Sequence, residues 1–246
     1  MVVRLRLDHM THGAQFRARV LRDHGRSGAL DPVLGVDHAY MGGPTFPPHP
    51  HAGFSAVSYV FSDAETGLNN RDSIGTINLI RPGGLHWTAA GRGIVHEETP
   101  ADSGKVAHLF QIFIDLPVTI KNAAPFAISL EPEDVPVVQR NGALIRVPLG
   151  HFEKFSSPLE TPTRITLLDI TLDAGATLQV PLDDACNAFV IPVHGSISIN
   201  GMEFDVDGED IPAFPAASQS QHLILEANSS SAQAAVFFGL PISLQA

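Results

Sequence analysis

Two short pairs of potential metal ligands constrain this chain more than any other feature of its sequence. His49 and His51 stand two residues apart, and His96 and Glu98 are spaced in the same way. Alternate side chains of a β-strand point to the same face of the sheet, so each pair projects its two ligands together. Two such strands lying side by side bring three imidazoles and one carboxylate to one point. The sequence therefore predicts a divalent-metal site and a β-barrel that holds it.

The phase of each strand extends this prediction to the neighbouring residues. If His51 points inward along a continuous strand, then Val57 and Tyr59 share its face, whereas Ser58 points away. In the second strand the same alternation turns Glu97 away from the ligands. We therefore expect large apolar side chains beside the metal, and we expect Ser58 and Glu97 to face away from it.

The same residues have a simpler interpretation, in which the histidines lie on the surface and Glu97 and Glu98 are a solvated acidic pair. Each pair, however, follows a turn signal and runs into or out of an apolar strand. That context favours a metal site over isolated surface histidines.

Composition excludes several classes of protein. The chain has 246 residues, a formal net charge of -11, 44% hydrophobic residues and 17% charged residues. An acidic balance argues against direct nucleic-acid binding, which needs a basic surface. The single cysteine, Cys186, rules out a disulfide within the chain and suggests a reducing compartment. There is no apolar signal segment at the N-terminus and no run as long as a membrane span, so we expect a cytoplasmic protein without membrane contact.

The chain reads as strands almost throughout, and helical periodicity is weak. Residues 106–116 are apolar on both faces, which is typical of a strand in a sheet that is covered on both sides. Asn200 and Gly201 supply a type I′ turn between two alternating segments, the strongest hairpin signal in the chain. The sequence predicts an all-β fold.

The second half of the chain resembles the first. Residues 56–63 align with 188–195, and residues 113–117 align with 237–241 in the same order. Two matches in one order indicate a duplicated β-barrel. We therefore expect an N-terminal barrel over 1–120, a Pro-rich connecting segment over 121–160, and a C-terminal barrel over 161–246.

Only the first repeat carries the predicted ligands. The alignment places His49 and His51 opposite Pro181 and Asp183, and no His-x-Glu pair occurs near His222. The sequence therefore predicts one metal ion per chain.

The stretch between residues 49 and 100 resembles the pirin family, whose members are bicupins, and the resemblance extends over residues 30–242. The shared motifs are His49-Pro50-His51-x-Gly53-Phe54, Asp72-Ser73-x-Gly75, Pro82-Gly83 and Trp87-Thr88-Ala89-x-Gly91-Arg92-Gly93-Ile94-x-His96-x-Glu98. The resemblance implies two stacked cupin (jelly-roll) β-barrels, with iron held in the first by the residues matching His49, His51, His96 and Glu98. The sequence departs from the family at Ser55, where Glu is usual, and at His86, where Gln is common. His86 would offer a further imidazole near the metal.

The predicted ligand set fixes the expected chemistry. Three imidazoles and one carboxylate, with no thiolate, suit Fe(II), Mn(II), Ni(II) or Cu(II) better than a structural zinc ion. The resemblance favours Fe(II), with Mn, Ni, Cu or Zn as alternatives. Some pirins are similar to cupin flavonol dioxygenases, which implies a quercetin 2,3-dioxygenase activity on a small aromatic or flavonol-like substrate and O₂. Glu98 is then the expected catalytic base, once it loosens from the cation.

Two other functions fit the same sequence. One is an iron-dependent regulatory protein that binds a protein partner without turnover, as animal pirins are associated with transcription factors. The other is a relic that holds a metal and does nothing with it.

Overall fold

The computed structural model describes residues 2–22, 28–216 and 221–245, and of Gln221 only the backbone. These residues form 23 β-strands and one short 3-10 helix, η1 (Ile242–Leu244). The predicted all-β class is therefore confirmed. Within the described ranges, no helix has the length and apolar character needed to cross a membrane.

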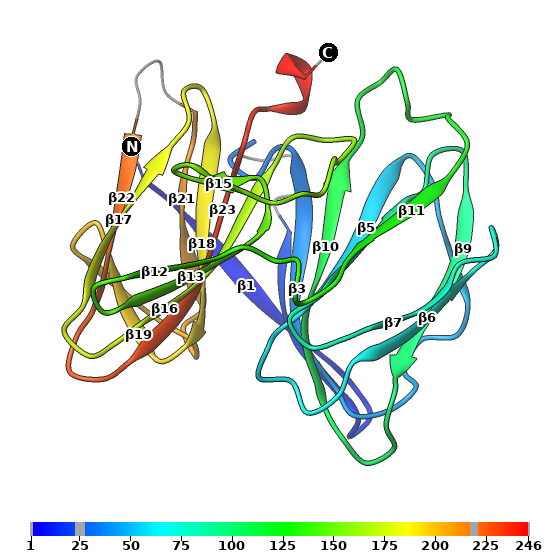
Figure 1. Ribbon diagram of the computed structural model, residues 1–246, viewed down its shortest axis with the longest axis horizontal. Coiled ribbons are helices and arrows are strands. Elements are labelled where there is room, and N and C mark those ends of the chain that lie inside the picture. Colours follow the sequence, from blue (N-terminus) through cyan, green and yellow to red (C-terminus); the bar gives the residue numbers. More distant parts are fainter. Residues whose placement is uncertain (1, 23–27, 217–220, 246) are drawn as a thin grey trace.

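One long sheet runs through the whole molecule (Figure 1). In spatial order it consists of β11 (Phe126–Leu130), β8 (Leu85–Ala89), β5 (Phe54–Val60), β10 (Ala107–Asp115), β3 (Val33–Met41), β2 (Phe16–Arg22), β1 (Val3–His12), β21 (Asp210–Phe214), β18 (Asn187–His194), β23 (Ala232–Gly239), β16 (Thr166–Leu172), β13 (Ala143–Leu149) and β12 (Val137–Arg140).

Two four-stranded sheets complete two lobes. The N-terminal lobe combines the β11-to-β2 part of the long sheet with β4 (His49–His51), β9 (Ile94–Pro100), β6 (Leu68–Asp72) and β7 (Ile77–Ile80). The C-terminal lobe combines the β21-to-β12 part with β17 (Thr177–Leu182), β22 (Gln221–Ala227), β19 (Ser196–Ile199) and β20 (Met202–Asp205). A small hairpin, β14 (His151–Phe152) and β15 (Phe155–Ser156), stands apart from these sheets.

The two lobes repeat one topology. The order β8-β5-β10-β3 in the first corresponds to β21-β18-β23-β16 in the second, and β4-β9-β6-β7 corresponds to β17-β22-β19-β20. The aligned sequence segments lie on β5 and β18 and on β10 and β23, so the predicted duplication is confirmed.

The first strand belongs to both lobes. Residues 3–6 of β1 pair with β21, whereas residues 7–12 pair with β2. The segment 121–160 is also shared, because β11 pairs with β8 and β13 pairs with β16. The predicted boundaries at 120 and 160 stay a prediction, and the structure adds that strand pairing links the segment between them to both lobes.

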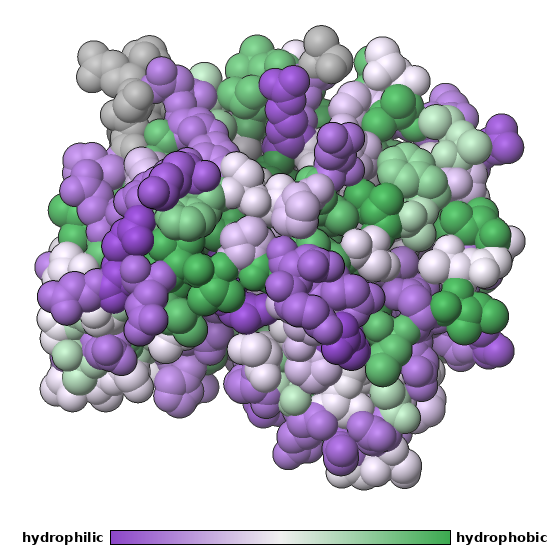
Figure 2. Space-filling model, viewed as in Figure 1, coloured by the Kyte–Doolittle hydropathy of each residue, from purple (hydrophilic) through white to green (hydrophobic). Residues whose placement is uncertain are grey.

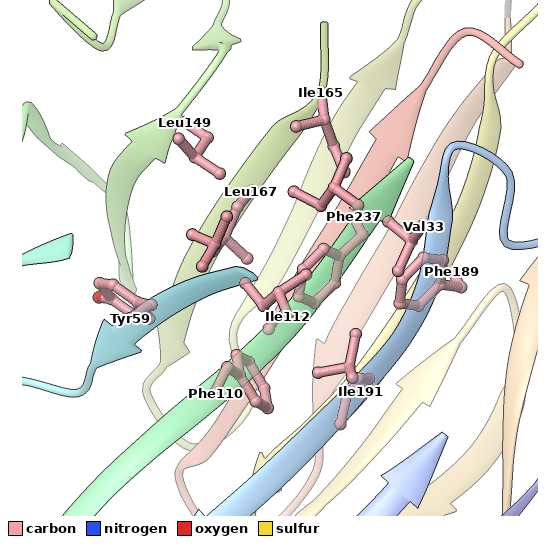
Figure 3. Close-up of a cluster of buried hydrophobic side chains, with 14 of the residues drawn as sticks. Val33, Tyr59, Phe110, Ile112, Leu149, Ile165, Leu167, Phe189, Ile191 and Phe237 are labelled. Carbon is pink, nitrogen blue, oxygen red and sulfur yellow. The ribbon is translucent and has the colours of Figure 1, made fainter. Parts of the chain in front are cut away.

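The core between the lobes is large and aromatic (Figure 3). Phe110 and Ile112 of the N-terminal lobe pack in one cluster with Phe189 and Phe237 of the C-terminal lobe, and the last two rings are stacked 4.7 Å apart. Such buried aromatic side chains contribute much of the apolar area that holds an interface together. Elsewhere, on the face drawn in Figure 2, hydrophilic and hydrophobic residues are interspersed.

Candidate metal site

Strands β4 and β9 bring three of the four predicted ligands together. The two strands pair antiparallel, with His49 directly opposite His96 and His51 opposite Ile94. One ring nitrogen from each of His49, His51 and His96 lies within 4.8 Å of the other two. The Nε2 atoms of His51 and His96 are 3.0 Å apart. The i, i+2 spacing therefore produces the convergence that the sequence predicts.

Two of the three rings are held neutral by burial, and the third is oriented by the backbone. Nδ1 of His49 lies 3.0 Å from the Pro47 carbonyl, which can only accept, so Nδ1 donates this hydrogen bond and Nε2 is the nitrogen left to bind a metal. Burial lowers the pKa of His51 to about 4, assisted by His49. Burial, with the neighbouring histidines as the next cause, lowers the pKa of His96 to about 3. Neutral imidazoles this close together suit a divalent transition metal.

Glu98 lies in the same cavity but outside the three-nitrogen cluster. Its carboxylate accepts a hydrogen bond from Ser58, whose Oγ is 2.8 Å from one carboxylate oxygen and 2.7 Å from the other. Burial raises the pKa of Glu98 to about 7, and the Ser58 hydrogen bond opposes that rise. A carboxylate with a pKa near neutrality can take up and release a proton under ordinary conditions. Glu98 therefore lies beside the histidines with its pKa raised into the neutral range.

The predicted phase of β5 is wrong. Val57 and Tyr59 belong to the core between the lobes, and Ser58 is the residue that reaches the histidine side. The reason lies at Gly53, which has a positive φ of 79° and separates β4 from β5. Because the two strands belong to different sheets, the alternation restarts after the break. The predicted orientation of β9 holds, since Glu97 points outward and pairs with Arg71 at 2.7 Å.

The histidines and Glu98 line a cavity of about 260 Å³ inside the N-terminal lobe. Its other walls are mostly apolar, with Gln111 and Asp37 as polar exceptions, and the larger apolar side chains are Phe16, Met41, Phe46, Leu109 and Phe113. Gln111 lies 3.0 Å from Ser58 through its Oε1 atom. A small apolar cavity with a few convergent polar groups is the usual form of a ligand site.

Sequence reasoning missed Ser58 and Gln111. Both follow from the period-2 pattern once β5 is taken to begin at Phe54, because Ser58 then falls on the same face as the interior residue Val60. Ser58 and Gln111 are also direct cross-strand neighbours on β5 and β10. The alternating pattern of β5 was present in the sequence, but the break at Gly53 shifted its phase relative to β4.

His86 does not join the ligand cluster. Its Nε2 accepts a hydrogen bond from Asn70 at 3.2 Å, and its Nδ1 lies 2.8 Å from the hydroxyl of Ser129. Burial lowers the pKa of His86 to about 4. Both ring nitrogens are thus engaged, and His86 supports the wall beside the histidines. Ser55 is buried too, and it lies outside the residues that line the cavity.

The C-terminal lobe has no equivalent site in the described residues. Across 2–22, 28–216 and 221–245, the histidine cluster of β4 and β9 is the only group of three or more ligand side chains close enough to share a metal ion. In the second repeat Pro181 pairs with His222 where the first repeat pairs two histidines.

Comparison with known proteins agrees with these features. The pirin family model matches residues 10–114. Pirin of Mus musculus is 35% identical over 185 residues, which cover 74% of this chain and 63% of the mouse protein. The chain therefore spans somewhat less than two thirds of the length of that relative.

Solved structures share the fold along the whole chain. A Geobacillus kaustophilus protein is 26% identical with a TM-score of 0.87, covering 99% of this chain and 97% of that one. A quercetin 2,3-dioxygenase of Acinetobacter baumannii is 22% identical with a TM-score of 0.83, covering 98% and 79%. A bacterial pirin of Escherichia coli, solved with nickel(II), is 18% identical with a TM-score of 0.74, covering 98% and 100%. With the two-lobed all-β fold and the family-model match through the histidine pairs, this chain belongs to the pirin family of bicupins.

Proposed function

We propose that this protein is a metal-dependent dioxygenase that acts on a flavonol-like substrate. The observation that carries the proposal is the combination in one cavity of three converging imidazoles and a buried carboxylate whose pKa is raised to about 7. His49, His51, His96 and Glu98 would hold a single divalent transition metal, and Glu98, once it loosens from the cation, is the catalytic base. The likeness to a quercetin 2,3-dioxygenase structure supports this choice of reaction.

Fe(II) is the proposed metal, with Mn, Ni, Cu and Zn as alternatives. Imidazole nitrogen with a single carboxylate nearby suits all of these ions, so the ligands alone do not select among them. The nickel(II) in the Escherichia coli pirin structure is consistent with a site of this kind. When bound, a redox-active divalent metal supplies an electrophilic centre to which substrate oxygen atoms can bind.

The protein's own contribution is to orient the substrate and accept its proton. The apolar walls formed by Phe46, Leu109 and Phe113 exclude water and fit an aromatic ring. Glu98, held by Ser58, accepts the proton of a substrate hydroxyl. The cavity of about 260 Å³ is small for a whole flavonol, so one end of the molecule enters and the rest lies at the mouth.

The lone buried Cys186 fits a reducing compartment such as the cytoplasm.

An iron-dependent regulatory protein that binds a protein partner is the second candidate. Val95 lies between Ile94 and His96 on β9, is 41% exposed and faces away from the ligands. Ile77 on β7 of the same sheet is 82% exposed. Exposed apolar side chains on the outer face of the ligand-bearing sheet favour a protein contact there.

Metal-free protein reconstituted separately with Fe(II), Mn(II), Ni(II) and Cu(II) tests the proposal. Quercetin consumption should require both the metal and O₂, and one equivalent of O₂ should be consumed for each equivalent of quercetin. If no metal supports turnover, the dioxygenase proposal is wrong, and the regulatory function is then favoured. A pull-down compared between oxidised and reduced iron then tests that candidate directly.

A further inference from the structure

A second cavity, of about 370 Å³, lies between the two lobes on the other side of β3 from the histidine cluster. The alternation along β3 separates them. Ala39 and Met41 line the cavity of the candidate metal site, whereas His38 and Tyr40 line the second one. The C-terminal lobe closes it with Val193, a residue of β18. The second cavity is thus distinct from the proposed active site, although the two share a wall.

Arg19 lacks hydrogen-bond partners in this wall, and its charge is offset only through space, by Asp207 and Asp205. Its three guanidinium nitrogens are buried and have no hydrogen-bond partner. The register of β1, β2 and β3 places His9, Arg19 and His38 in one row across the strands. A buried guanidinium without hydrogen bonds carries a free-energy cost that a hydrogen-bonding anionic partner would reduce. Burial is also the main cause that lowers the pKa of Arg19.

His38 presents an unsatisfied acceptor next to Arg19. The carboxylate of Asp63 lies 2.9 Å from Nδ1 of His108 and accepts its proton. Nε2 of His108 is 2.8 Å from Nε2 of His38. In neutral rings the His38 Nε2–H must therefore donate, which leaves His38 Nδ1 with a lone pair. That atom is buried and has no partner, in a side chain that is 2% exposed.

The neutrality of both rings follows from their surroundings. Burial, with His108, Arg19 and Arg17 as further causes, holds the pKa of His38 well below its usual value. Burial also lowers the pKa of His108, although Asp63 opposes this. Proton donors on Arg19 and a proton acceptor on His38 thus stand side by side on paired strands. Side chains so paired have Cβ atoms about 5 Å apart, within the span of a small molecule.

The rest of the cavity restricts the ligand further. Arg17 lies over one face of the Tyr40 ring at 3.9 Å and His108 stacks on the ring at 4.5 Å, so Tyr40 presents its ring edge to the cavity. Met10 and Val206 add apolar contacts. Asp207 is the one carboxylate among the lining residues and disfavours a second negative charge on the ligand. The surroundings therefore suit an aromatic monoanion better than phosphate.

We infer that this cavity binds a small aromatic hydroxycarboxylate of the hydroxybenzoate class. Its carboxylate pairs with the Arg19 guanidinium, which matches carboxylate geometry with two parallel hydrogen bonds. Its hydroxyl donates to Nδ1 of His38, and its ring lies against the apolar and aromatic walls. The site stands independently of the proposed dioxygenase activity, because it uses none of the four residues assigned to that activity.

Calorimetric titration of the full chain with 3-hydroxybenzoate tests this inference. Arg19→Gln should weaken binding by about 10- to 100-fold, the effect of losing a hydrogen-bonded charge pair. Arg6→Gln is the matched control, since Arg6 lies on the adjacent strand β1 with its side chain 78% exposed. It should bind the probe as the unaltered protein does. Equal binding by the Arg19→Gln protein, or no saturable binding by the unaltered protein, would overturn the site.

Three further binding measurements test whether the probe binds at this cavity and in the proposed way. Binding to His51→Ala protein should be unchanged, and its loss would show that the probe binds at the histidine cluster instead. Benzoate should bind more weakly than 3-hydroxybenzoate, and equal affinity would contradict the role of His38. Inorganic phosphate should not compete, and competition would overturn the carboxylate class.

Because Arg19 is largely buried, His194→Glu provides a second variant: this exposed residue lines the cavity, and the added charge should weaken binding without disturbing the core.

Discussion

The hydroxyl of Ser58, on the long sheet, lies 2.8 Å and 2.7 Å from the two carboxylate oxygens of Glu98, on the four-stranded sheet opposite. The hydroxyl proton of Ser58 thus forms a hydrogen bond to a buried carboxylate on the opposite sheet of the lobe. Because Ser58 stabilises the charged form of Glu98, it partly offsets the effect of burial on the Glu98 pKa.

Glu98 should make metal-free protein less stable as the pH rises. Its folded pKa of about 7 lies above its ordinary value of 4.5, so its contribution is complete below pH 4.5 and is lost as the pH rises through about 7. Urea unfolding at pH 5 and pH 8 measures the loss. The change between the two should be smaller in Glu98→Gln protein, which does not titrate there. Ser58→Ala should move the loss to higher pH. Identical pH dependence in all three proteins would show that Glu98 has an ordinary pKa.

His51→Ala should abolish most metal binding, because two imidazoles are too few strong neutral ligands to hold the ion through dialysis. His12→Ala is the matched control, since His12 is exposed at the end of β1. Elemental analysis of dialysed protein should give one equivalent for the control and much less for His51→Ala. Equal metal content in the two variants would remove His51 from the ligand set.

Glu98→Gln should separate metal binding from turnover. The amide keeps the shape of the side chain and cannot accept a proton, so activity on quercetin should fall by about 10²- to 10⁴-fold while the three histidines retain most of the metal. Glu97→Gln, which removes an outward-facing partner of Arg71, should change the rate little. Normal turnover by Glu98→Gln together with a crippled Glu97→Gln would mean that the orientation of β9 is inverted.

Tyr59→Phe should destabilise the core between the lobes. The Tyr59 hydroxyl donates a 2.7 Å hydrogen bond to Asp169 on β16, and both residues are buried. Leaving a buried carboxylate oxygen unpaired should cost about 1–3 kcal/mol in the free energy of unfolding. Tyr40→Phe is the control, because Tyr40 is only half-buried and its ring contacts survive the change. Equal losses in the two variants would show that the hydrogen bond to Asp169 contributes little.

Cys186 should be chemically inert and dispensable. Burial, with Asp183 and Asp184 nearby, raises the pKa of the thiol to about 11 from 9.0. At pH 8 the thiolate fraction is then about 100-fold lower than in an ordinary cysteine, and alkylation by iodoacetamide should slow accordingly. Cys186→Ser protein should keep its metal and its activity. Rapid alkylation at pH 8 would contradict the raised pKa.

The sequence predicted what depends on local periodicity. The i, i+2 spacing of His49 and His51 determines which side of a strand they occupy, so the cluster could be derived without a structure. The phase of β5 could not, because the break at Gly53 moves the chain from one sheet to another. Arg19 gave no signal either, since nothing in its neighbourhood along the chain shows that the second lobe closes over it.

The divided pairing of β1 has a consequence for how the chain is made. Val3 pairs with Ala213, so β1 leaves the ribosome about 210 residues before the strand it pairs with. At about 5–20 residues per second, that delay lasts on the order of 10–40 seconds. During this time residues 3–6 present an unpaired strand edge, and contacts of this long range form slowly even after synthesis ends. Until β21 is made, residues 3–6 are therefore a site at which the nascent chain can aggregate or bind a chaperone.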